Sequence, residues 1–489
     1  MDDLARVWED GGFGVVADGR LDRVKAGRAE VDGFLASDAG SAFVANSFSP
    51  GLISCLFRLK KACGQDVSQE KVEWTVGFPD GVVADVTFHC LRIARNLCIN
   101  EQVRPCFYGV IGPCVDLMGY LEWLHKGSAH KEWQALIQKL GFIMPQFLCN
   151  LCAQDDSARA QLWNTKNVFA SISGLMSFAN SSPCDFKTLQ GSMCLLYASS
   201  LNNPVLLETI SKDDHLVLTI LASAVVSLNV LNGENENVDS HDPAIVDTHA
   251  YIVWLVGNLV NAGLGENLLK ATQGTEKLQL ALLSLWLGSR LEDEEQRRNG
   301  EVVNDSTTIE YSFVALETFY LSIVHKRRAG TVNDICSQIE QIALRLLGSY
   351  TTDSRVYLKN QTKGALINIV LDELDNATLN KETCSYGQRG DLLRVIANVC
   401  YKRVTNQNVV REHKNGLFVV LNQCNVDENS PYLREWAILA IRNLTEGNPM
   451  NQEVIANLRL NGTVQNSVIE KAGLKVEMTE DGKAKLTRM

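Results

Sequence analysis

The chain has 489 residues, of which 46% are hydrophobic and 21% are charged, and its formal net charge is −11. This composition supplies enough apolar side chains for a large core, and it excludes a disordered, low-complexity chain. An acidic balance without a basic stripe argues against a nucleic-acid surface, because neutralising phosphates requires clustered Lys and Arg. We therefore expect no nucleic acid among the partners.

The N-terminal residues predict neither a secretion signal nor a cofactor site. They lack a basic region followed by an apolar stretch. Residues 12–17 (GFGVVA) fit the loose dinucleotide pattern G-x-G-x-x-A, but no apolar strand precedes them. We expect a turn there, within a partly helical segment of residues 1–45. The missing signal predicts a cytoplasmic protein whose fourteen cysteines are reduced.

Helical periodicity dominates residues 46–380, which we interpret as N-terminal and middle armadillo-like repeats. Residues 216–231 form the longest apolar run, but a membrane span needs about 20 cleaner residues. This run therefore predicts a buried helix and no membrane association. Polar stretches at 232–242 and 292–306 predict loop insertions between repeats.

Residues 381–465 contain the clearest repeat. Asp391 is predicted to cap a helix with one apolar stripe, and residues 406–413 and 417–424 are predicted to form two shorter helices. The order of helices restarts after about 45 residues, which is the period of armadillo and HEAT units.

The next long helix has clear signals at both ends. Ser430 is predicted as its N-cap, with Pro431 at the first helical position, where a missing N–H costs nothing. Gly447 supplies a left-handed stop. Asn448 and Pro449 repeat the cap-then-proline start, so two helices are expected to meet at a tight corner.

The remaining residues, 466–489, form a predicted tail with a hairpin around Asp481 and Gly482. A three-helix unit cannot bury its apolar faces alone, so neighbouring units stack. The sequence therefore predicts an all-α fold, namely an armadillo- or HEAT-like right-handed α-solenoid of stacked two- and three-helix repeats.

Residues 431–452 (PYLREWAILAIRNLTEGNPMNQ) resemble the hallmark of the ataxin-10 family. Residues 392–412, 473–486 and 91–102 resemble other parts of that family, and the strong resemblance covers about the last hundred residues. The resemblance implies an armadillo-like solenoid that acts as a cytoplasmic interaction scaffold without enzymatic activity. It also implies links to cell division, cell survival and signalling.

No catalytic, cofactor or metal motif stands beside this resemblance. Phosphate-loop, zinc-protease and nucleophile-elbow patterns do not occur in the sequence. Cys149 and Cys152 are a single pair on a predicted helix, whereas a structural zinc requires four ligands. His241 and His249 stand eight residues apart in or near a loop. We expect no enzyme, no cofactor and no metal.

An asparagine near the end of each long helix is the most informative polar feature. The asparagine and the residue four positions earlier lie on one helix face, and an amide can both donate to and accept from a bound peptide backbone. These pairs are Arg92/Asn96, Gln146/Asn150, Trp254/Asn258, Arg394/Asn398 and Leu439/Asn443.

Two interpretations of these asparagines stay open. They could bond to helix ends within their own repeats. Alternatively, they could line a groove in which Arg92 and Arg394 favour acidic or phosphorylated segments. The candidate protein-binding groove comprises Arg92, Asn96, Trp254, Asn258, Arg394, Asn398 and Asn443. Trp436 is predicted to belong to the core, because it keeps register with apolar neighbours.

The functional prediction is a non-enzymatic scaffold that binds other proteins, with self-association as a further expectation. The alternative is a cargo or nuclear-transport adaptor. Cargo-carrying armadillo proteins use successive Trp and Asn pairs, and in this sequence only Trp254 and Asn258 keep that pairing.

Overall fold

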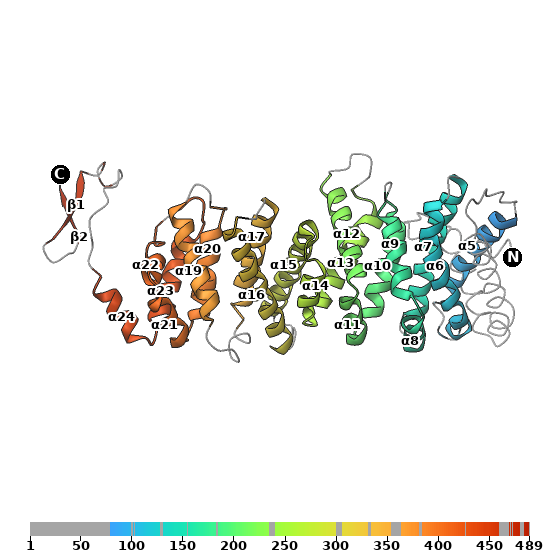
Figure 1. The fold of residues 1–489 in the computed structure, drawn as a ribbon, viewed down its shortest axis with the longest axis horizontal. Helices are drawn as coiled ribbons and strands as arrows, with labels where there is room; N and C mark the ends of the chain where they lie inside the picture. Colours follow the sequence, from blue (N-terminus) through green and yellow to red (C-terminus); the bar gives the residue numbers. More distant parts are fainter. Residues whose placement is uncertain are drawn as a thin grey trace, which may run out of the picture. The chain divides into compact units, whose positions relative to one another are not determined.

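In the computed structural model, the described residues lie between 79 and 488, so the predicted segment 1–45 and the GFGVVA turn lie outside them. The described stretches are 79–98, 101, 103–127, 131–153, 155–181, 184–233, 240–299, 306–330, 334–353, 363–380, 384–425, 427–458, 469, 471, 473–479 and 484–488. They contain nineteen α-helices, one 3-10 helix and one two-stranded sheet (Figure 1). The predicted all-α helical-repeat solenoid is confirmed.

The chain divides into two compact units, and the first comprises residues 1–315 and 333–339. Its helices are α5 (Pro79–Leu97), η2 (Arg104–Val110), α6 (Ile111–Gly127), α7 (Lys131–Cys152), α8 (Asp156–Asn164), α9 (Val168–Ala179), α10 (Phe186–Ser200), α11 (Pro204–Lys212), α12 (Asp214–Leu231), α13 (Pro243–Asn261), α14 (Gly265–Ala271) and α15 (Glu276–Arg298). Two helices, α16 (Ser306–Arg328) and α17 (Asp334–Tyr350), contribute residues to both units.

The first unit has two layers of helices. In one layer α5, α7, α10, α13 and α15 pack each against the next, and in the other α6 packs on α9 and α9 on α12 (Figure 1). Short helices such as α8 and α11 precede each pair of longer ones. The repeating order of short, medium and long helix is therefore present in this unit.

Aspartate and asparagine caps start several of these helices. Asp155, Asp185, Asn203 and Asp213 each accept a hydrogen bond from the backbone N–H three residues later. Such a cap satisfies one of the four backbone donors that a helix N-terminus leaves free. The boundaries of α8, α10, α11 and α12 thus follow from local sequence.

Two helices of this unit, α12 and α13, are long and apolar enough to cross a membrane by length and composition alone. Half of the apolar window of each is buried inside the structure. The predicted helix at 216–231 is α12, which packs against α9, α13 and α15.

The second unit comprises residues 316–332 and 340–489. Its further helices are α19 (Gly364–Leu379), α20 (Gln388–Cys400), α21 (Val404–Glu412), α22 (Gly416–Leu421), α23 (Leu433–Thr445) and α24 (Pro449–Ala456). The long helices α19, α20 and α23 pack in sequence order. The predicted boundary between residues 380 and 381 falls inside this unit.

The predicted hairpin of the tail is present as β1 (Leu474–Met478) and β2 (Ala484–Arg488), which pair antiparallel with Val476 opposite Leu486. The tight corner is also confirmed. Gly447 has a φ of 72°, and the Asn448 side chain accepts from Asn451 N at the start of α24.

Three predicted boundaries are wrong. Helix α20 begins at Gln388, so Asp391 lies in its first turn and is not its cap. Helix α23 begins at Leu433, after Tyr432 with a φ of 61°, so Ser430 is not its N-cap. Helix α15 continues to Arg298, so residues 292–298 of the loop predicted at 292–306 are helical.

Candidate protein-binding surface

One face of the first unit carries polar and aromatic side chains across four helices. On α13 this face contains Asp247, Tyr251, Trp254 and Asn258, which follow one another at helical spacing of four, three and four residues. The neighbouring helix α10 presents Gln190, Cys194 and Tyr197 toward them. We call this face the stripe; it comprises Arg92, Arg95, Gln146, Cys149, Gln190, Cys194, Tyr197, Asp247, Tyr251, Trp254 and Asn258.

Side-chain contacts join the stripe from helix to helix. Arg95 Nη1 of α5 donates to Gln146 Oε1 of α7 at 2.7 Å. Gln190 Nε2 of α10 donates to Asp247 Oδ2 of α13, also at 2.7 Å. These contacts join α5 to α7 and α10 to α13 along the stripe.

Aromatic rings gather at the α10–α13 end of the stripe. The ring centroids of Tyr197 and Trp254 are 5.4 Å apart, those of Tyr197 and Tyr251 5.9 Å, and those of Tyr251 and Trp254 5.8 Å. These separations lie within the range of favourable aromatic pairs. Trp254 nevertheless keeps 47% of its surface exposed. The three residues form an aromatic platform with one residue nearly half exposed.

The α5 end of the stripe is basic. Burial, followed by the neighbouring charge of Arg92, lowers the pKa of Arg95. Arg95 Nε donates to the Asn96 side-chain oxygen at 3.1 Å, and both Arg92 and Asn96 are half-buried. Of the predicted groove residues, Arg92 and Asn96 lie on α5, and Trp254 and Asn258 lie on α13.

Asn150 and Asn443 donate hydrogen bonds to the preceding repeat, which neither open interpretation described. Asn150 Nδ2 of α7 donates to Arg95 O of α5 at 3.0 Å. In the second unit, Asn443 Nδ2 of α23 donates to Ala397 O of α20 at 2.8 Å. Each acceptor is the residue just before the asparagine of the preceding long helix, so these side chains clamp adjacent repeats together.

Asn398 makes the same kind of bond. Its Nδ2 atom lies 3.4 Å from Gly348 O and 3.1 Å from Thr351 Oγ1 at the end of α17. Since the amides of Asn398 and Asn443 are engaged with protein, and Asn443 is only 4% exposed, these two residues hold the fold.

A second set of side chains completes the carboxyl end of α20. The last four carbonyls of an α-helix have no partner within the helix. Here Ala397 O accepts a hydrogen bond from Asn443 Nδ2. Val399 O accepts from Asn406 Nδ2 at 2.7 Å, and Cys400 O accepts from Gln407 Nε2 at 3.2 Å. The remaining carbonyl, Asn398 O, accepts from the backbone N–H of Tyr401.

The next repeat uses the same solution 45 residues later. Asn451 Nδ2 donates to Leu444 O at 2.8 Å and Gln452 Nε2 donates to Thr445 O at 2.8 Å, at the end of α23. Gln407 also reaches Asn443 O at 2.7 Å. The recurring Asn-Gln pair is thus explained by the carbonyls that it satisfies.

Arg394 and Trp436 form a separate contact in the second unit. The Arg394 guanidinium lies over the Trp436 ring, 5.9 Å from its centroid, and Arg394 Nε is buried without a hydrogen bond among the described residues. Trp436 is half-buried and not fully part of the core, since its ring packs under this arginine at the surface of α20 and α23.

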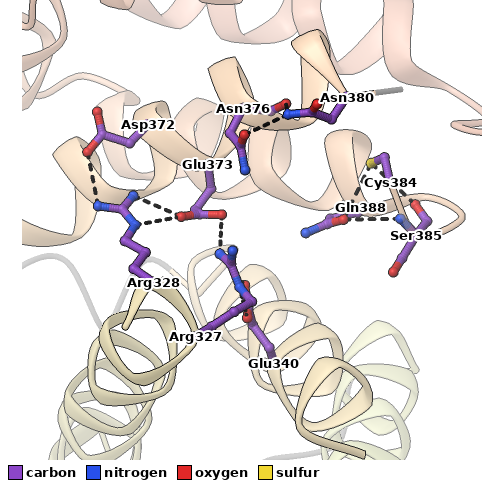
Figure 2. Close-up of polar contacts among 10 residues, drawn as sticks. All are labelled: Arg327, Arg328, Glu340, Asp372, Glu373, Asn376, Asn380, Cys384, Ser385 and Gln388. Atoms are coloured by element: carbon purple, nitrogen blue, oxygen red, sulfur yellow. Dashed lines mark hydrogen bonds and ion pairs between the residues drawn. The ribbon is translucent and has the colours of Figure 1, made fainter. Parts of the chain in front are cut away.

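An ion-pair cluster joins α16, α17 and α19 within the second unit (Figure 2). Arg327 Nε contacts Glu340 Oε2 at 2.7 Å, and Arg327 also contacts Glu373. Arg328 contacts Glu373 Oε1 at 2.8 Å and Asp372 Oδ2 at 3.3 Å. The two glutamate side chains are only 7% and 5% exposed.

Electrostatics favour charged arginines in this cluster. Burial works against the Arg327 charge, but the hydrogen bond and charge of Glu340, with those of Glu373, raise the pKa of Arg327 overall. Burial raises the pKa of Glu340, and Arg327 opposes that shift. Every charge here has an opposite partner inside the fold, so we interpret the cluster as a structural lock.

No group of three or more His, Cys, Asp or Glu side chains in the described part of the chain is arranged to hold a metal ion. The twelve cysteines described there form no disulfide.

The comparison with protein families is decisive for the C-terminal repeats. Residues 388–487 match the model of the spinocerebellar ataxia type 10 protein domain. These residues are similar to the ataxin-10 family. The match runs from α20 to β2 and includes the Asn-Gln pairs at 406–407 and 451–452, so the resemblance seen in the sequence is confirmed over this region.

Relatives named ataxin-10 share this same part of the chain. The ataxin-10 homolog of Dictyostelium discoideum is 40% identical over 106 residues, which are 22% of this chain and 17% of that protein. Ataxin-10 of Homo sapiens is 42% identical over 91 residues, 19% of each chain. This chain therefore aligns with less than a fifth of either relative, and the stripe of the first unit lies outside the ataxin-10 domain.

Among solved structures, a crystal structure of an engineered protein resembles 85% of this chain and 98% of its own, with a TM-score of 0.32 and 12% identity. A likeness of that size carries no functional argument.

Proposed function

We propose that this chain is a non-enzymatic, cytoplasmic scaffold of the ataxin-10 type that binds an extended segment of a partner protein on the stripe. The observation that supports this most directly is the aromatic platform, where Trp254 is 47% exposed although it packs against two tyrosines. Trp, Tyr and Arg are the residues that dominate binding energy at protein interfaces. Both ends of the stripe supply them.

The stripe also indicates the length and chemistry of the segment. Three helix-to-helix steps separate α5 from α13, and packed helices lie about 8–10 Å apart, so the stripe spans about 27 Å. An extended chain rises about 3.3 Å per residue, which gives about eight residues. Arg92 and Arg95 favour a carboxylate or phosphate at one end of the segment, and Trp254 favours an apolar side chain at the other.

Trp254→Ala tests the proposal, with Tyr311→Ala as the matched control because Tyr311 is an exposed aromatic residue on α16, a helix that contributes no residue to the stripe. Proteins captured from cytosol by the wild-type chain should be lost with Trp254→Ala and kept with Tyr311→Ala. The purified partner should then bind the Trp254→Ala chain at least tenfold more weakly. Equal binding by all three chains would remove the stripe as the binding site.

A transport adaptor remains the second candidate, because Trp254 and Asn258 share one face of α13 with the carboxylate of Asp247. Such a surface would take a basic segment by placing a cation over the indole. Labelled acidic and basic peptides of eight residues distinguish the candidates by fluorescence anisotropy. Trp254-dependent binding of the basic peptide alone would favour the adaptor.

We further propose that the chain self-associates through its last helices, as one element of a role in cell division, survival or signalling. Phe418 on α22, Ile438 on α23 and Met450 on α24 are 51%, 52% and 60% exposed. Exposed apolar side chains on helices that pack together favour contact with another protein surface. Sedimentation of Ile438→Lys should show a smaller assembly than the wild type, whereas an identical assembly would refute this contact.

A further inference from the structure

Two thiols meet at the centre of the stripe. Cys149 of α7 and Cys194 of α10 come from adjacent repeats, and their sulfur atoms lie 3.3 Å apart. Neither residue is fully buried. By contrast, Cys98, Cys114, Cys152 and Cys400 are buried thiols of the core.

The pKa values of the two thiols shift in opposite directions. The hydrogen bond from Cys149 lowers the pKa of Cys194 to about 7; burial opposes the shift and a hydrogen bond from Tyr251 assists it. The same sulfur–sulfur hydrogen bond, with burial, raises the pKa of Cys149. Of the two thiols, Cys194 therefore has the lower pKa.

Burial raises the pKa of Cys152 to about 12 and that of Cys184 also to about 12. Thiolate is the reactive form of cysteine. At neutral pH the lower pKa of Cys194 favours reaction at Cys194 over Cys152 and Cys184.

We propose that Cys149 and Cys194 are a reversible disulfide site on the stripe, oxidised by hydrogen peroxide and reduced by thiols. In the first step the Cys194 thiolate attacks one peroxide oxygen. The O–O bond breaks, hydroxide leaves and takes up a proton to become water, and Cys194 becomes a sulfenic acid.

In the second step Cys149 attacks the Cys194 sulfur. The S–S bond forms, the S–O bond breaks, and hydroxide leaves with the Cys149 proton as water. Overall, two thiols lose two electrons and two protons, and one peroxide becomes two waters. Reduction by a dithiol returns both thiols by exchange.

The second step requires only a small movement of the two sulfur atoms. A disulfide has an S–S distance of about 2.05 Å, so the sulfurs need to approach by only about 1.2 Å. The helices that carry them, α7 and α10, already pack directly on one another. In a reducing cytosol such bonds are transient and serve redox sensing. The bond would staple two repeats together across the stripe.

The test uses the full-length chain, reduced and freed of reductant. After treatment with hydrogen peroxide and blocking of free thiols, peptide mass spectrometry without reduction should find a Cys149–Cys194 cross-link. Dithiothreitol should remove it. The same cross-link should form in Cys152→Ser, because Cys152 shares a tryptic peptide with Cys149 and would otherwise confuse the assignment.

Cys149→Ser provides the decisive control. It leaves Cys194 without a resolving thiol, so peroxide should now give a dimedone-reactive sulfenic acid at Cys194 and no cross-link. Circular dichroism checks that the variant remains helical. Cys424, a half-exposed thiol with a pKa raised by burial, should react more than tenfold more slowly than Cys194 in the same sample.

Three results would overturn the proposal. These are a wild-type sulfenic acid at Cys194 that never resolves to a disulfide, a cross-link that disappears in Cys152→Ser, or reaction of Cys424 as fast as that of Cys194. None of them bears on partner binding by Trp254, so the disulfide site and the proposed scaffold function stand or fall separately.

Discussion

Replacing Asn443 by alanine tests whether the recurring asparagine holds adjacent repeats together. Asn443 is 4% exposed, and its amide donates to Ala397 O at 2.8 Å. That carbonyl lies in the last turn of α20, where the helix itself supplies no partner. Asn443→Ala therefore removes one hydrogen bond and leaves a buried acceptor unsatisfied.

The magnitude follows from those two losses. A net hydrogen bond contributes about 1 kcal/mol, and a buried acceptor without a partner costs about 1–3 kcal/mol. We expect a loss of about 2 kcal/mol in the stability of the contact between α20 and α23. Since about 1.4 kcal/mol is a factor of ten, amide exchange at the end of α20 should accelerate about thirtyfold.

Hydrogen exchange with mass spectrometry on peptides covering residues 393–403 measures this change. Asn422→Ala is the matched control, because Asn422 is exposed at the end of α22 and bonds there through its backbone N–H. An acceleration below threefold in Asn443→Ala would refute the clamp. Asn443→Asp should be worse than alanine at neutral pH, because a carboxylate would then face the Ala397 carbonyl.

Further substitutions test the lock, the backbone and the thiol pair. Glu373→Gln should lower the free energy of unfolding in urea by about 2 kcal/mol, less than a fully buried ion pair, because its arginine partners are 26% and 36% exposed. Tyr432→Gly should raise that free energy by about 1 kcal/mol, because glycine adopts the left-handed φ of this position without strain. Gly447→Ala should lower it by about 1 kcal/mol, because Gly447 also has a left-handed φ. Thermal melts that moved the opposite way would contradict both. Alkylation of Cys194 by iodoacetamide should rise with pH and reach half its maximal rate near pH 7; a midpoint near pH 9 would exclude the lowered pKa.

The helical fold could be predicted because it depends on periodicity and on short capping signals. Asn448 and Pro449 act within four residues, and Gly447 acts alone, so local rules sufficed for that corner. The same rules wrongly predicted Ser430 as the N-cap of α23. The backbone oxygen of Asn429 accepts from Gly387 N at 2.7 Å, so a contact to the start of α20 holds that loop in a turn and delays α23.

The predicted cap at Asp391 was wrong for a similar reason. It has the chemistry of a cap, but its carboxylate faces Arg345 Nε of α17 at 3.3 Å, and the helix starts three residues earlier. The aromatic platform was only half predictable. Trp254 and Asn258 stood out on one helix, whereas Tyr197 lies 57 residues before Trp254 and meets it only through packing of α10 on α13.

A signal for the platform was present within α13. Asp247, Tyr251 and Trp254 share one helix face in a segment that is otherwise strongly apolar. A polar and aromatic face in such a helix indicates a surface that the core does not use. The partner helix that completes the platform could not be named from that face.

The Asn-Gln pairs have a practical consequence for anyone who shortens this protein. A fragment that stopped at Thr445, where α23 ends, would lose the amides that reach Leu444 O and Thr445 O. Those amides belong to Asn451 and Gln452, in the opening helix of the next repeat. Viable cut points therefore lie one short helix beyond each apparent repeat boundary, and any recombination that swaps repeats must move the Asn-Gln pair together with the helix that precedes it.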